Sequence, residues 1–173
     1  MNKEILQGIK QTATYERLIA RFKELNEIGS NLPLLVDGVS DGALYSLLYS
    51  LSDDIKRIKK SPVLVLVGEE RKANKINEFL KKTGLRCEFF PVRDFNFYDM
   101  TSSHELEYER LRALSGVLFN TVDVVIATPD SSLQYTMTKS HLEKYTLEIN
   151  KDTSLDIFQI VKRSWHLSFH PIV

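Results

Sequence analysis

Four short apolar runs constrain the fold of this chain most strongly. They are 32–36, 63–67, 87–90 and 123–127, and they mostly lack the alternation of apolar and polar residues that a half-exposed strand carries. Unalternated strands are typical of parallel sheets that are buried on both faces. Helical patterns separate the runs. The sequence therefore predicts an α/β fold, a three-layer parallel sheet of four strands with helices on both faces.

The segments between the runs carry helical periodicity and helix-end signals. We expect helices from Tyr15 to near Gly29, after residue 40, and over about 70–82 with Gly84 as the C-terminal cap. A further helix places four apolar side chains on one face, namely Tyr108, Leu111, Leu114 and Leu118. Beyond Pro129 the pattern loosens, and it predicts a short helix over 131–136, a strand over 145–149 and a helix over 154–163.

Composition narrows the class of protein. Lysine plus arginine and aspartate plus glutamate each number 23 in a chain of 173 residues, so no global field attracts nucleic acid or an anionic membrane. A single cysteine, Cys87, excludes an internal disulfide framework. No apolar run approaches the roughly 20 residues that cross a bilayer, and the start lacks a secretory apolar stretch. We therefore expect a cytoplasmic protein without a membrane partner.

The turn after the first apolar run is where an open parallel sheet commonly binds ligands. Its sequence, DGVSDGALY over 37–45, aligns with a phosphate loop when Gly38 is taken as the first glycine. Leu44 then stands where the phosphate-binding lysine belongs, and Tyr45 where the magnesium-binding hydroxyl belongs. The carboxylate of Asp41 would repel phosphate by like charge. This pattern predicts a degraded phosphate loop that cannot serve as an ATP site.

The same turn also has a purely structural interpretation. Gly38 and Gly42 lead from a strand into a helix, and Ser40 or Asp41 caps that helix through a side-chain oxygen. The helix N-terminus leaves weak anion binding as an open alternative.

Further motifs follow in a fixed order after this loop. They are Phe90-Pro91-x-x-Asp94-x-x-x-Tyr98-Asp99, Glu109-Arg110-Leu111-x-x-Leu114, Val124-Val125-Ile126-Ala127-Thr128-Pro129, and Leu133-Gln134. Over residues 30 to 150 the chain resembles the N-terminal region of Mfd-type bacterial transcription-repair coupling factors. That region is itself similar to UvrB, the helicase subunit of nucleotide excision repair.

This resemblance implies a degenerate RecA or P-loop helicase-like domain that has lost its ATPase. Such a module is a non-catalytic adaptor that recruits UvrA and takes part in autoinhibition, within a longer ATP-dependent DNA translocase. Residues 1–143 would form the helicase-like domain, and 144–173 would begin an incomplete second domain, where the family's UvrA contacts mainly lie. RNA polymerase and DNA would be reached only through other domains of the full-length coupling factor. No cofactor is implied.

Two other classes of function remain as alternatives. One is a nucleotide-binding P-loop ATPase or helicase domain with an atypical loop. The other is a nucleic-acid-binding domain, for which the only hint is a set of basic residues, namely Lys56, Arg57, Lys59, Lys60, Lys72, Lys75, Lys81 and Lys82. The four histidines and one cysteine show no metal-ligand spacing, so we expect no metal site.

The aromatic residues between Phe89 and Tyr98 could stack bases, with Arg93 on a phosphate. Acidic neighbours favour packing instead. We expect Arg110 to pair with one of these acids, for example Asp99.

Overall fold

The computed structural model describes residues 6–93 and 105–146. The chain divides into two compact units, Met1–Gln134 and Tyr135–Val173, and each is described by itself. The domain boundary that the sequence places at 143/144 stays a prediction.

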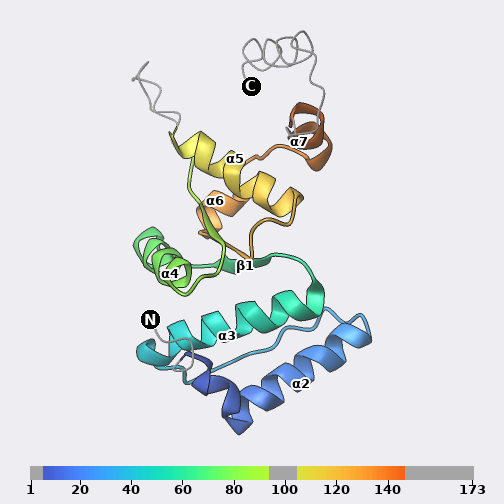
Figure 1. Ribbon diagram of the computed structural model, residues 1–173, viewed down its shortest axis with the longest axis vertical. Coiled ribbons are helices and arrows are strands. Elements are labelled where there is room, and N and C mark those ends of the chain that lie inside the picture. Colours follow the sequence, from blue (N-terminus) through green and yellow to red (C-terminus); the bar gives the residue numbers. More distant parts are fainter. Residues whose placement is uncertain (1–5, 94–104, 147–173) are drawn as a thin grey trace. The chain divides into compact units, whose positions relative to one another are not determined.

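The first unit contains a parallel sheet of three strands (Figure 1). These are β1 (Val63–Leu66), β2 (Cys87–Phe90) and β3 (Val124–Ala127), in the order β1-β3-β2. Val63 and Cys87 both lie opposite Val124 in the register. Three of the four predicted strands are therefore confirmed, and so is their parallel pairing.

Helices account for most of the remaining described residues. They are the 3₁₀ helix η1 (Gly8–Gln11) and the α-helices α2 (Ala13–Glu27), α3 (Asp41–Lys59), α4 (Glu70–Lys82), α5 (Glu105–Leu118), α6 (Pro129–Leu133) and α7 (Lys139–Tyr145). Gly29 and Gly84, just beyond α2 and α4, have positive φ angles of 66° and 88°. This left-handed conformation ends helices and suits glycine, so both predicted helix ends are confirmed. In the described residues no helix is long and apolar enough to cross a membrane.

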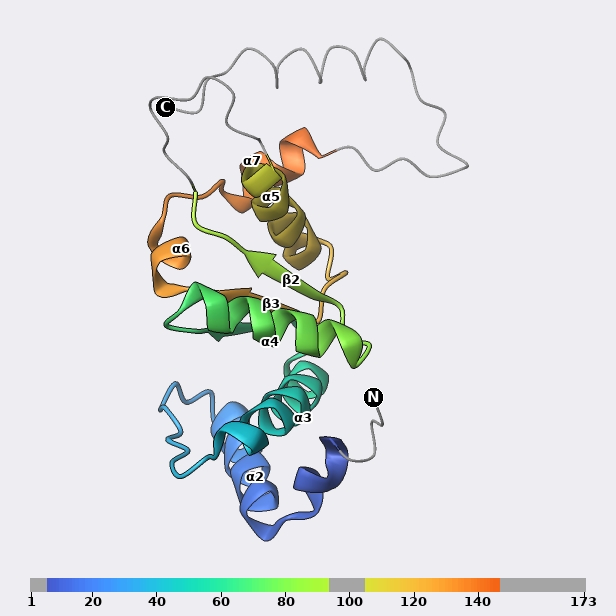
Figure 2. The same ribbon diagram turned by 90° about the vertical axis from the view of Figure 1, so that its left-hand side faces the viewer.

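Helices cover the sheet on both faces (Figure 2). On one face Val124 and Ile126 of β3 pack with Ile76 of α4 and Tyr49 of α3. On the other face Val125 and Ala127 belong to a second cluster, which includes Ala113 of α5. Successive residues of a strand point to opposite faces, so an unalternated apolar strand supplies both clusters. The predicted three-layer arrangement is confirmed.

The face that α5 buries differs from the predicted one. Tyr108 and Leu111 are exposed, whereas Arg110, Ala113 and Gly116 are buried. Gly116 lies so close to the loop before β3 that a Cβ atom on it would be 2.4 Å from Val122 Cγ1. The helix therefore approaches the sheet through small residues, and of the predicted face only Leu114 packs against the core cluster.

The predicted strand over 32–36 is not formed. Residues 30–40 have no regular secondary structure, and Leu32 and Leu35 are 66% and 94% exposed. The apolar run has the composition of a buried strand, but a strand also needs a neighbour to bond, and in this structure the segment has none along its backbone within the described residues.

The C-terminal elements were predicted only in part. The short helix expected over 131–136 is α6, which begins and ends earlier. Helix α7 was not predicted, and Tyr145 belongs to it and not to the strand expected from that residue. Thr146 is the C-cap of α7, and residues 147–149 of that strand and the helix expected over 154–163 lie outside the described residues.

Candidate functional site

The carboxyl ends of β2 and β3 hold the densest arrangement of polar contacts in the motif residues. Phe90 and Pro91 end β2, Arg110 comes from α5, and residues 128–134 follow β3. The sequence motifs that lie far apart along the chain are thus brought together at one edge of the sheet. We call the set Phe90, Pro91, Arg93, Arg110, Ser131 and Gln134 the Arg110 cluster.

Arg110 is the centre of this cluster and is only 6% exposed. Its Nη1 donates to the backbone oxygens of Pro91 at 2.6 Å and Ser131 at 3.3 Å. A third contact joins Nη1 to Gln134 Oε1 at 3.3 Å. The guanidinium carbon lies 3.9 Å from the centre of the Phe90 ring, within the range of a cation–π interaction. One side chain therefore joins the end of β2 to α6.

The charge of Arg110 is buried without a carboxylate at hydrogen-bond distance in the described residues. Burial lowers its pKa, Arg93 lowers it further, and Glu107 opposes both. Arginine nevertheless keeps its proton at neutral pH. Nη2 is buried and has no hydrogen-bond partner in the part of the chain that the structure describes. The predicted partner Asp99 lies outside the described residues, as do Asp94 and Tyr98.

Gln134 fixes the chain that leaves β2. Its Oε1 accepts from the backbone N–H of Arg93 at 2.6 Å, and its Nε2 donates to the backbone oxygen of the same residue at 3.3 Å. The guanidinium of Arg93 bonds Glu107 at 3.1 Å and 3.3 Å. Because that guanidinium lies on a carboxylate, it is not presented to a phosphate, contrary to the alternative considered from sequence.

A capping box begins α6. Thr128 Oγ1 accepts from Ser131 N at 3.2 Å, and Ser131 Oγ accepts from Thr128 N at 3.0 Å. Pro129 occupies the first turn, where its missing N–H costs nothing. Thr128 follows the strand in an extended conformation and is the N-cap of this helix.

The degraded phosphate loop forms the capped start of α3. Gly38 has a φ angle of 73°, and Ser40 Oγ accepts from Ala43 N at 3.4 Å. Of the two predicted caps, Ser40 is therefore the N-cap, and Asp41 and Gly42 begin the helix. Between residues 6 and 40 no strand precedes the turn.

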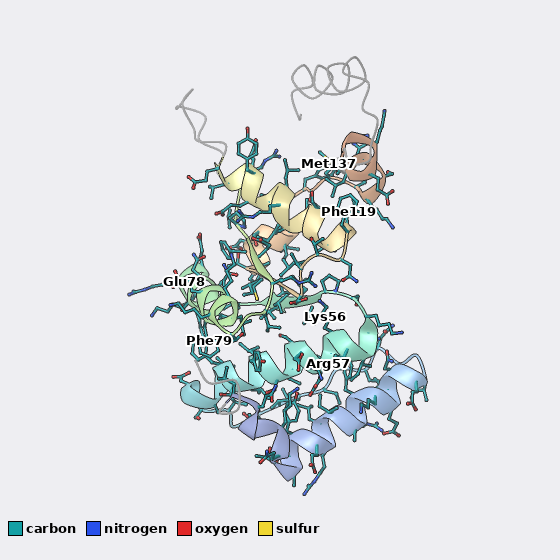
Figure 3. The ribbon with its side chains drawn as sticks, viewed as in Figure 1. Lys56, Arg57, Glu78, Phe79, Phe119 and Met137 are labelled. Carbon is teal, nitrogen blue, oxygen red and sulfur yellow. The ribbon has the colours of Figure 1, made fainter. Side chains whose placement is uncertain are left out.

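The two positions that matter for phosphate chemistry are engaged in packing. Leu44 is half-buried, and Tyr45 packs against the core with its ring 4.8 Å from that of Phe79. Phe79 lies on the side of α4 that faces α3 (Figure 3). Neither side chain supplies a cation or a free hydroxyl at the helix start.

Much of the basic run at the end of α3 is engaged within the chain. Lys56 bonds Asp123, Arg57 pairs with Asp53 at 3.1 Å, and Lys59 lies 6.0 Å from the centre of the Phe22 ring. Lys56 and Arg57 extend from α3 (Figure 3). Asp123 also accepts from the backbone and guanidinium of Arg86. The partners of Lys56 and Lys59 lie far apart from them in the chain, so no local pattern predicts these two contacts, whereas Arg57 and Asp53 are one helical turn apart.

The described residues include no group of three or more metal-ligating side chains. Cys87 is buried, and burial raises the pKa of its thiol to about 12, which makes it a poor nucleophile at neutral pH.

Comparison of the chain with protein-family models, with curated proteins and with solved structures gave no match.

Proposed function

We propose that the chain is a non-catalytic interaction module, a degenerate helicase-like domain of a transcription-repair coupling factor that recruits UvrA. The observation that carries this proposal is the Arg110 cluster. Residues from separate motifs converge there, at the edge where an α/β sheet usually binds a ligand, and they bond one another. A site filled in this way stabilises a surface for a partner.

The start of α3 supports the same proposal. A phosphate loop binds a nucleoside triphosphate through the lysine of the loop and through the hydroxyl that holds magnesium. Leu44 and Tyr45 occupy these positions; Leu44 is half-buried, and Tyr45 packs against the core. The rival proposal, a P-loop ATPase with an atypical loop, needs a substitute cation at this helix start.

The outer face of α5 is the contact surface that we assign to the partner. Tyr108 and Leu111 are 68% and 38% exposed and lie one turn apart. Exposed apolar side chains on one helix face are typical of protein contacts. The Arg110 cluster holds the opposite side of the same helix against the sheet.

Two titrations test the proposal. Isothermal titration with ATP and magnesium should show no heat of binding, and a micromolar dissociation constant would contradict the lost ATP site. Biolayer interferometry with purified UvrA should show binding that Leu111→Asp weakens at least about tenfold, equivalent to about 1.4 kcal/mol. The matched control is Arg112→Ala on the same helix, which removes an exposed ion pair to Glu88 of β2 and should leave binding unchanged. Absence of UvrA binding would refute the partner and leave the ATP result intact.

A further inference from the structure

One edge of the sheet is open. β1 pairs with β3 alone in the described residues. Val63 N donates to Asp123 O, and Val67 N donates to Ala127 O. Backbone groups alternate in direction along a strand, so the amides of Leu64 and Leu66 face away from β3. Their side chains are 58% and 55% exposed. An exposed apolar edge strand of this kind pairs readily with another strand.

The segment that precedes α3 has the complementary composition. Residues 32–36 are apolar throughout, and Leu35 and Val36 are 94% and 40% exposed. The sole proline, Pro33, is tolerated in an edge strand. Figure 1 shows residues 28–40 running from the end of α2 to the start of α3, opposite in direction to α3, and β1 also runs opposite to α3. The segment and β1 therefore already run the same way.

The handedness of the crossovers decides which edge the segment can join. The connection from β1 to β2 passes through α4 on one face, and the return from β2 to β3 passes through α5 on the other. Helix α3 shares the face of α4. Because crossovers between parallel strands are right-handed, the connection through α3 into β1 must advance in the same direction as the one from β1 to β2. The strand before α3 then belongs beside β1, on the side away from β3.

We infer that the open edge of β1 is a docking surface for residues 32–36 of the same chain, which add to it as a fourth parallel strand. The extended order is 32–36, β1, β3, β2. This is a second arrangement of the segment, distinct from the irregular one described above. Its gain is the burial of apolar side chains on both partners, together with hydrogen bonds for the open edge.

The two turns that follow these stretches set the register. Gly38 follows the first stretch and Gly68 follows β1, and each glycine lies two residues after the position compared here, Val36 and Leu66. Aligning these glycines places Val36 opposite Leu66 and Leu34 opposite Leu64. Val36 then shares a face with the exposed leucines, whereas Leu35 points to the opposite face.

Disulfide trapping tests this register. Adjacent strands lie about 4.8 Å apart, within the Cα separation of about 4.4–6.8 Å that a disulfide allows. The test pair is Val36→Cys with Leu66→Cys, and the control pair is Leu35→Cys with Leu66→Cys. Random collisions of an irregular segment would favour the control, because Leu35 is the more exposed of the two. Docking predicts that the test pair forms an intramolecular disulfide at least about tenfold faster than the control.

Equal rates, or a faster control, would overturn the inference. Disulfide-linked dimers would also overturn it, because they would show a second copy on the edge. The second measurement is hydrogen exchange of the unmodified chain. It replaces the disulfide test if the circular dichroism of the cysteine variants shows that they have lost their helices. Docking slows exchange of the Leu64 and Leu66 amides at least about tenfold relative to an unstructured peptide, and unslowed exchange would overturn it.

Discussion

Gly116 allows a quantitative test of how α5 packs on the sheet. A methyl group at this position would meet Val122 Cγ1 at 2.4 Å, and Val122 is 5% exposed and belongs to the core. The helix end is held close by the bond from Thr121 N to Gly116 O at 2.9 Å. The valine side chain has few alternative rotamers, so relief requires a shift of the backbone.

The magnitude follows from two opposing contributions. Overpacking of this kind costs about 2 kcal/mol, whereas replacing a helical glycine by alanine gains about 1 kcal/mol. Gly116→Ala should therefore lower the free energy of unfolding by about 1 kcal/mol. In a Val122→Ala background both Cγ atoms are absent, so the same substitution should raise the free energy of unfolding by about 1 kcal/mol.

Urea denaturation followed by circular dichroism measures both changes. Gly42→Ala in α3 is the matched control, because a Cβ there would meet nothing within 4 Å. This control should leave stability unchanged or raise it by a few tenths of a kcal/mol. The reasoning is refuted if Gly116→Ala changes stability in the same direction with Val122 and with alanine at 122.

Three further predictions concern stability. Thr128→Val keeps the shape of the side chain but removes the cap of α6, so unfolding should cost about 1 kcal/mol less, and Thr128→Ser should restore most of the loss; equal stability of both variants in urea would contradict this. Asp123→Asn should lower the free energy of unfolding by about 2 kcal/mol, because the hydrogen bonds from Lys56 and Arg86 would then end on a neutral amide in place of a carboxylate. An unchanged melting temperature would count against the contribution of these two bonds. For Cys87 the folded-state pKa is raised from 9.0 to about 12. Below pH 9 the thiol is protonated in both states and has no effect; above it the unfolded chain releases the proton first, so unfolding becomes easier by up to about 1.4 kcal/mol per pH unit until pH 12. Cys87→Ala should lack this part of the alkaline slope, and identical slopes would show the prediction to be wrong.

The strands of the core were predictable because successive residues are buried on opposite faces of the sheet, so most positions are apolar. Val124 to Ala127 is apolar without alternation, and each residue is buried against a helix on one side or the other. The run over 32–36 carries the same signal. It differs in containing Pro33 and in having no neighbouring strand bonded to it, and no local pattern reports the second difference.

Four members of the Arg110 cluster, Phe90, Pro91, Arg110 and Gln134, belong to the sequence motifs, but their contacts with one another were not predicted. Within the described residues Arg110 bonds backbone oxygens, which have no sequence identity to recognise, and its pairing with Asp99 stays a prediction. The burial of Arg110 with Ala113 and Gly116 was also hidden, because neither a charge nor a small residue marks the inner face of a helix. Contacts between residues far apart in the chain determine both the partners of Arg110 and the buried face of α5.

Gln134 has a mechanical consequence that follows from its position. It is the last residue of the first compact unit, and its side-chain amide holds the backbone of Arg93 through two hydrogen bonds. Tension applied from residue 135 onward is therefore divided between α6 and the chain that leaves β2. A pull on the end of this unit reaches the sheet through two strands, β3 by way of α6 and β2 by way of Arg93.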